Sequence, residues 1–129
     1  MRAALSAVIL LGAILDGVLG FGFLSNPAQA GENLGLGAAG AMGLSTLRAD
    51  LTAFFLVAAG FMTLGAWKRR GDILIAPLAL FLIALTGRGL NLLVAGGYEG
   101  WWLPMAVEAA HVAVLAAAIG VWDWRGASA

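Results

Sequence analysis

The chain has 129 residues, of which 62% are hydrophobic and 11% are charged, against about 25% charged residues in an ordinary soluble domain. So small a soluble protein would leave too much apolar surface in water, and the composition therefore favours an integral membrane protein. The net charge is zero and cysteine is absent, which excludes an electrostatic nucleic-acid footprint, disulfides and metal–thiolate sites.

Four apolar segments have the length of a membrane helix, because a hydrocarbon core of about 30 Å takes roughly 20 apolar residues. We predict helices over about residues 3–24, 51–67, 73–94 and 103–122. Pro77 and Pro104 fall in the first turns of the last two, where proline is tolerated. No linker or repeat divides the chain. We therefore predict a single all-α domain, an integral membrane four-helix bundle.

The first apolar segment has a competing interpretation as a cleaved signal peptide. Ala28, Gln29 and Ala30 resemble a signal-peptidase site after an apolar stretch. However, this stretch has about 20 residues rather than the roughly 7–15 of a signal peptide, and Asp16 interrupts it. We favour retention of the segment as a membrane helix; cleavage would leave three helices with the amino terminus outside.

The segment over residues 33–47 joins the first two predicted helices and interleaves small residues with Leu and Met. It is too short to span a membrane, and non-helical backbone at membrane depth needs protein around it. We predict a short interfacial or re-entrant segment that packs over the outer end of the bundle as a lid. A mobile apolar loop is the alternative.

The basic residues indicate how the helices are oriented. On one side lie Arg2, Lys68, Arg69, Arg70 and Arg125. Glu32 and Glu99 lie in the opposite loops. The positive-inside rule makes the basic side cytoplasmic, so we predict that both termini face the cytoplasm. Tryptophans at helix ends anchor to the membrane interfaces, and we assign Trp67, Trp122 and Trp124 to the inner interface and Trp101 and Trp102 to the outer one.

The ionisable residues within the predicted helices share a depth. At a rise of about 1.5 Å per residue, the outer half of the bundle contains Asp16, Arg48, Asp50, Arg88, Glu108 and His111, and Asn91 lies one turn after Arg88. Each charge facing lipid costs up to about 2.5–3.5 kcal/mol at a helix centre. We therefore predict that these side chains gather inside the bundle.

The spacing of these residues limits which of them can pair with one another. Glu108 and His111 are three residues apart and share a helix face. Arg88 has two candidate partners, Glu108 and Asp16. Its role is open as well, because a structural ion pair and a ligand site are equally compatible with its position. Arg48 and Asp50 are two residues apart, so only one of them faces inward. Arg48 has the alternative of snorkelling to the interface.

A metal site receives little support. Glu108 and His111 form a Glu-x-x-His pattern, but di-iron bundles need that pattern twice plus two more glutamates. A lone histidine with scattered carboxylates is also a weak zinc set. We expect no metal and no cofactor, and we expect His111 to bond Glu108 or a backbone carbonyl.

A family resemblance rests on four elements: residues 47–51 (Leu-Arg-Ala-Asp-Leu), Gly87 with Arg88, Glu108, and Asn26 with Pro27. The chain resembles, over nearly its whole length, a family of small bacterial four-helix membrane proteins known only as domain of unknown function 4345. The resemblance implies the fold and a bacterial inner-membrane location. It also implies a polar signature made of Arg48, Asp50, Arg88 and Glu108, but it supplies no reaction.

Our first functional hypothesis is a binding protein with a polar pocket in the outer half of the bundle. This pocket would take a small or amphipathic ligand, such as a lipid or quinone head group, because intramembrane ionisable residues mark sites. Arg48 and Arg88 would hold the ligand, and Glu108 and His111 would exchange protons with it. The alternative is an accessory or assembly subunit of a larger membrane complex, or a homo-oligomer. A proton-coupled transporter and a lipid-modifying isomerase rank lower, so an enzyme is not favoured.

Overall fold

A computed structural model describes residues 1–122, and the predictions for Trp124 and Arg125 concern residues outside this range. Four helical stretches are long and apolar enough to cross a membrane. They are α1 (Arg2–Ser25), a continuous stretch over Gly40–Lys68 that ends in α4 (Thr52–Lys68), α5 (Ile75–Ala95) and α6 (Trp102–Val121). The chain is therefore an all-α, multi-pass membrane protein, as predicted.

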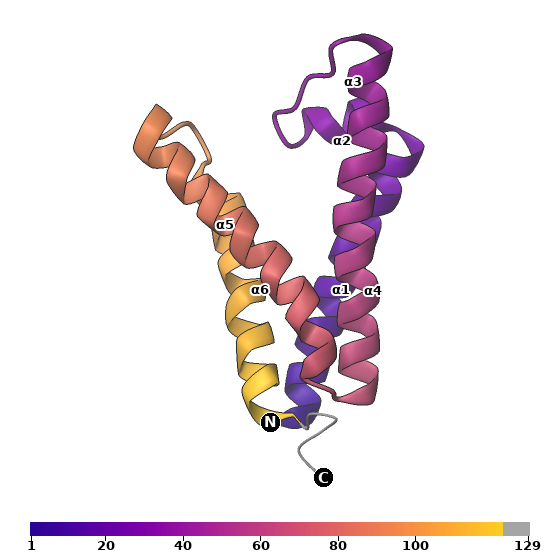
Figure 1. Cartoon of the computed structure of the whole chain (residues 1–129), viewed down its shortest axis with the longest axis vertical. Helices are drawn as coiled ribbons and strands as arrows, with labels where there is room; N and C mark the ends of the chain where they lie inside the picture. The colour runs from indigo at the N-terminus through magenta and orange to yellow at the C-terminus, as the bar shows by residue number, and fades with distance from the viewer. Residues whose placement is uncertain (123–129) are drawn as a thin grey trace.

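The four long helices form two arms (Figure 1). One arm consists of α1 and α4 side by side, and the other consists of α5 and α6. The arms meet at the end of the molecule that carries the amino terminus, where α1 contacts α6 and α4 contacts α5. They diverge toward the other end. The bundle is thus closed at one end and open at the other (Figure 1).

Small residues let α1 and α4 approach closely. Gly20 and Ala13 of α1 are buried, as are Ala58 and Ala59 of α4. A Cβ atom added at Gly20 would lie 2.6 Å from Leu56 Cδ2 and 3.2 Å from the Leu56 backbone nitrogen. Glycine and alanine at such positions let helix backbones pack tightly in a membrane, where van der Waals contact replaces the hydrophobic effect.

The apolar core lies toward the closed end, where all four long helices meet. Its buried side chains include Ile9, Met62, Leu74, Phe81, Leu115 and Trp122. We predicted Trp122 as an interfacial side chain, but only 3% of it is exposed. The chain turns out of α6 at this residue, and the indole therefore packs into the core rather than anchoring at a membrane surface.

The second spanning helix begins at Gly40 rather than near residue 51. It consists of α3 (Gly40–Thr46), a five-residue π-helix η1 (Leu47–Leu51) and α4. No proline interrupts residues 40–68, and Ala, Leu and Met there favour helix. From Lys68 to Arg48 the helix rises about 30 Å at about 1.5 Å per residue. Arg48 therefore lies near the far boundary of the hydrocarbon layer, and α3 extends beyond it.

The predicted lid does not form over the bundle. After α1, Asn26 caps α2 (Pro27–Glu32) by accepting a hydrogen bond from the Gln29 backbone N–H. The chain then passes through residues 33–39 into α3. These elements contact α1 and η1 and lie at the far end of the α1–α4 arm (Figure 1). Residues 40–47 instead extend the second spanning helix.

The short turn at the closed end gathers basic residues. α4 ends at Lys68, the next residue Arg69 has a left-handed φ of 51°, and the 3-10 helix η2 (Asp72–Leu74) follows. Arg70 forms an ion pair with Asp72, and this hydrogen bond raises the pKa of Arg70 above its ordinary value. Pro77 and Pro104 are each the third residue of a helix, as predicted.

Candidate functional site

Three titratable side chains are buried in the described part of the chain, and all three were predicted site residues. The exposed fractions are 2% for Asp16, 8% for Glu108 and 9% for His111. His111 lies nine residues after Trp102 and ten before Val121, so it is near the mid-height of α6, about 14 Å from each end at about 1.5 Å per residue. Asp16 lies at a similar height on α1.

Arg88 pairs with Glu108 rather than with Asp16, which resolves the alternative that the sequence left open. Arg88 Nε donates to Glu108 Oε1 at 2.8 Å, linking α5 to α6. The side chains are 37% and 10% exposed. The second carboxylate oxygen, Glu108 Oε2, is buried without a hydrogen-bond partner among residues 1–122.

His111 links the two arms. Its Nδ1 lies 2.8 Å from the Val107 carbonyl oxygen. Because a carbonyl only accepts hydrogen bonds, Nδ1 carries a hydrogen and donates it. The other ring nitrogen, Nε2, lies 3.4 Å from Asp16 Oδ2 on α1. That contact is too long or too poorly aligned for a hydrogen bond, and both atoms are buried without a hydrogen-bond partner in the described residues.

The geometry also bears on the protons of the Asp16–His111 pair. With Nδ1 as the donor to Val107, a neutral imidazole would direct the Nε2 lone pair at a carboxylate. Two acceptors repel each other at this distance, so we expect the pair to share one further proton. With that proton the pair is neutral overall, and so is Arg88 with Glu108. Such a balance is what a membrane interior requires.

Neighbouring residues from three helices hold the imidazole ring in place. Phe81 of α5 stacks on it with ring centroids 4.2 Å apart. A Cβ atom added at Gly12 of α1 would lie 2.9 Å from both His111 Nε2 and Met62 Cε of α4. Gly12, Met62 and Phe81 were not among the predicted site residues. One signal was available, because Gly12 precedes Asp16 by four residues and so shares its helix face.

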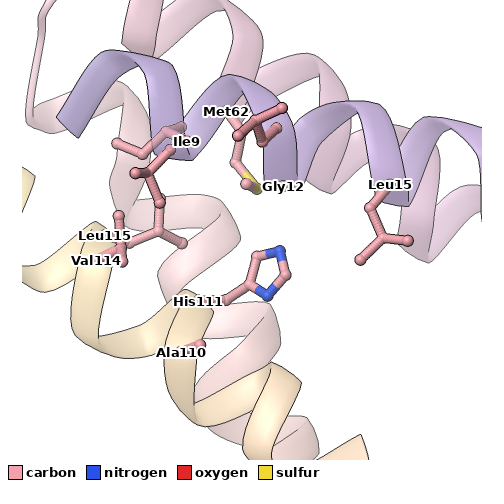
Figure 2. A pocket seen from close by; sticks show the side chains of 10 residues that line it. Ile9, Gly12, Leu15, Met62, Ala110, His111, Val114 and Leu115 are labelled. Atoms are coloured by element: carbon pink, nitrogen blue, oxygen red, sulfur yellow. The ribbon is translucent and has the colours of Figure 1, made fainter. Parts of the chain in front are cut away.

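A groove of about 300 Å³ lies beside His111, between α1 and α6 (Figure 2). Val8, Leu11 and Leu15 line it from α1, and Ala110 and Val114 line it from α6. His111 is its one polar side chain among the described residues, and Figure 2 shows the ring projecting from α6 toward α1. The volume is at the lower end of the range for ligand pockets, roughly 300–1,000 Å³.

The remaining predicted site residues lie outside the buried cluster. Arg48, Asp50 and Asn91 are exposed. Arg48 Nε donates to the Leu24 carbonyl oxygen at 3.1 Å, so this side chain caps the carboxyl end of α1. Residues 33–47 do not line the groove. The described residues also hold no group of three side chains that are suited to bind a metal ion.

Comparisons of the chain with protein-family models, with curated proteins and with solved structures found no match. The resemblance to the domain of unknown function 4345 family therefore stays a prediction, as does a bacterial origin. The geometry of the site is the basis for any statement about function.

Proposed function

We propose that this membrane protein binds one small amphipathic molecule in the groove between α1 and α6. The apolar part of the ligand lies along Val8, Leu11 and Val114, and its polar end lies at His111. The observation that carries the proposal is a single polar side chain in an apolar groove, with a ring nitrogen that has no hydrogen-bond partner in the described chain. Concave apolar sites with few polar groups are the usual form of a ligand site.

The height of His111 limits the ligand further. A charged head group at the bilayer centre is costly, and His111 is near the middle of α6. The polar end of the ligand is therefore small and uncharged. This favours a lipid-like or quinone-like molecule over a phospholipid head group, and it gives Arg48 no direct part in binding. The proposal keeps the predicted class of function, with an apolar groove in place of a polar pocket.

A matched pair of glycine variants tests the proposal. Gly12→Ala places a methyl group against His111 Nε2, whereas no described atom lies within 4 Å of a Cβ atom at Gly17. Native mass spectrometry of protein extracted from its own membrane should detect a retained hydrophobic molecule with the wild type and with Gly17→Ala. Gly12→Ala should lose it. Retention of the same molecule by Gly12→Ala, or a wild type that carries nothing, would contradict the proposal.

We also propose that both termini face the cytoplasm and that the membrane is a bacterial inner membrane. The support is the charge distribution: Arg2, Lys68 and Arg69 lie at the closed end, and basic residues favour the cytoplasmic side. The chain has no cysteine, so single-cysteine variants report topology cleanly. An impermeant maleimide should label Ser45→Cys on intact cells and Lys68→Cys only after permeabilisation. The reverse pattern would contradict this orientation.

A second candidate function, an assembly subunit of a larger membrane complex or of a homo-oligomer, is favoured by another observation. Gly60 of α4 and Gly87 and Gly89 of α5 have no described atom within 4 Å of a Cβ position. Glycines on a helix surface permit close approach of a further helix. Purification from native membranes in a mild detergent should then yield a stoichiometric partner or an oligomer, and a lone monomer would contradict this candidate.

A further inference from the structure

We infer that the Asp16–His111 contact is a pH-sensitive junction: it holds the two arms together while the pair shares a proton and lets them separate when that proton leaves. The inference goes beyond the proposed function and needs no bound ligand. It stands on the position of the contact, since Asp16 belongs to the α1–α4 arm and His111 to the α5–α6 arm. Their facing atoms, Oδ2 and Nε2, lie 3.4 Å apart.

The contact lies well away from the closed end of the molecule. At that end Arg2 of α1 donates to the Val121 carbonyl oxygen of α6 at 3.1 Å, and Asp16 lies about 21 Å further along α1 at about 1.5 Å per residue. Phe54 of α4 and Phe81 of α5 also meet between the arms, with ring centroids 5.8 Å apart, but neither ring titrates. A change of charge in the pair therefore acts between the arms, far from the turn that joins them.

The imidazole ring is held so that it cannot turn away from Asp16. Its Nδ1 donates to the Val107 carbonyl oxygen at 2.8 Å, and Phe81 stacks on it with ring centroids 4.2 Å apart. On the α1 side, a Cβ atom at Gly12 would already lie 2.9 Å from Nε2. Repulsion within the pair is therefore passed on to the helices rather than relieved by rotation of the ring.

The proton decides whether the contact attracts or repels. When Nε2 carries it, an imidazolium faces a carboxylate, and a cation is also attracted to the stacked face of Phe81. When the proton leaves, the Nε2 lone pair faces the carboxylate. Moving the remaining ring hydrogen from Nδ1 to Nε2 does not help, because Nδ1 and the Val107 oxygen would then both be acceptors at 2.8 Å. The unprotonated pair is therefore more stable with the arms apart, where water reaches it.

The other charges that face the pair do not offset this loss. On α5 the one titratable side chain is Arg88, which is already bound to Glu108 of α6, one turn from His111. α4 carries no titratable side chain before Lys68, at its closed end, and α1 carries none between Arg2 and Asp16 or after Asp16. Without its proton the pair is negatively charged near mid-membrane, which is costly. Opening of the arms thus releases one proton, and closing takes it up.

The separation of the arms as a function of pH tests the inference. Ser45 in α3 and Glu99 in the loop after α5 are exposed and lie at the far ends of the two arms (Figure 1). The chain has no cysteine, so spin labels at Ser45→Cys and Glu99→Cys report one distance. In nanodiscs we expect this distance to become longer and its distribution broader between about pH 5 and about pH 10, a range around the ordinary histidine pKa of about 6.5.

The proton itself is followed on the same molecule. His111 is the only histidine of the chain, so its ring ¹⁵N resonances report when Nε2 loses its hydrogen. The midpoint of this titration should coincide with the midpoint of the distance change. A ring that titrates while the distance stays constant would overturn the inference, because the pair would then release a proton without moving the arms. A ring that does not titrate in this range would overturn it as well.

Two matched variants locate the response. Asp16→Asn removes the carboxylate and should give the same distance distribution at every pH. Glu108→Gln removes a titratable carboxyl group one turn from His111 but keeps an oxygen that accepts from Arg88, and it should keep the pH response of the wild type. Circular dichroism checks that each variant stays helical. A response that persists in Asp16→Asn, or that disappears in Glu108→Gln alone, would place the pH-sensitive group elsewhere and overturn the inference.

Discussion

The two arms of the bundle are held together by different means. In the α1–α4 arm, small residues bring the backbones close, as at Gly20 against Leu56. In the α5–α6 arm, an ion pair links Arg88 to Glu108 at 2.8 Å. Close packing of small residues buries no charge, whereas the ion pair holds only while both partners remain. One helix pair of this protein is therefore held by close packing and the other by an ion pair.

The Asp16–His111 contact belongs to neither arm and connects them. It joins α1 to α6 at 3.4 Å, near the mid-height of α6. We expect a shared proton, rather than two fixed charges, to hold this contact together. We therefore expect this junction to be more easily changed than either arm, which suits a place where a ligand enters.

The largest loss of unfolding free energy is expected from removing the ion pair of the α5–α6 arm. Glu108→Leu leaves Arg88 without its partner and should lower the free energy of unfolding by about 2 kcal/mol. This is less than the roughly 3–5 kcal/mol for a fully buried pair, because 37% of the Arg88 side chain is exposed. Equilibrium unfolding in mixed micelles measures it. The double variant Arg88→Leu/Glu108→Leu should recover most of the loss, and a double variant no more stable than the single one would argue against the pair.

The next largest loss of stability is expected in the α1–α4 arm, which is held by close packing. Gly20→Ala places a methyl group 2.6 Å from Leu56 Cδ2 and should destabilise the protein by about 1–2 kcal/mol through overpacking. The matched change Gly17→Ala meets no described atom within 4 Å and should be neutral or slightly stabilising, since alanine favours helix. Equal losses in both variants, in the same unfolding assay, would show that close approach at Gly20 is not what holds α1 to α4.

A smaller loss of unfolding free energy is expected at the Asp16–His111 contact. Asp16→Asn removes the charged partner of a 3.4 Å contact that does not have the geometry of a hydrogen bond. Polar contacts between membrane helices contribute about 0.6 kcal/mol on average, and we expect a loss of unfolding free energy near that value. Distances between spin labels at exposed positions 45 and 98 should broaden in the variant as the arms move more freely. A loss as large as that of Glu108→Leu would mean that the junction carries more of the fold than its geometry indicates.

The smallest loss of stability is expected at the end of the α1–α4 arm that lies away from the amino terminus. Arg48→Leu removes the hydrogen bond to the Leu24 carbonyl oxygen and should cost about 0.5 kcal/mol, as for other basic residues at helix carboxyl ends. Hydrogen exchange should accelerate in the last turn of α1 and nowhere in α5 or α6. Faster exchange throughout the bundle would contradict a purely local role.

The sequence predicted the depth of the ionisable residues along their helices better than the direction in which their side chains point. Hydropathy and length located four spanning helices, and the rise per residue placed Asp16, Arg88, Glu108 and His111 at related heights. Depth alone cannot say which way a side chain points, so Arg48 was grouped with residues that face inward although it is exposed. Small residues left the start of the second helix ambiguous, because the pattern over residues 33–47 suits an interfacial segment and a helix equally.

The side-chain pairings in the site could not be predicted from the sequence. Glu108 and His111 share a helix face, and the sequence indicated this. The pairing of His111 with Asp16 and of Arg88 with Glu108 depends on how α1 and α5 rotate against α6, which no single-chain pattern encodes. Phe81 was not among the predicted site residues, although it stacks on the imidazole.

The most direct test is the protonation state of the single histidine. In protein labelled with ¹⁵N-histidine and held in nanodiscs, Nδ1 should carry a hydrogen, because it donates to the Val107 carbonyl oxygen. The Nε2 resonance should shift when Asp16 is replaced by asparagine, because the proton of the pair lies between these two side chains. A histidine with a bare Nδ1 and a hydrogen on Nε2, unaffected by Asp16→Asn, would contradict the shared proton on which the junction and the ligand site depend.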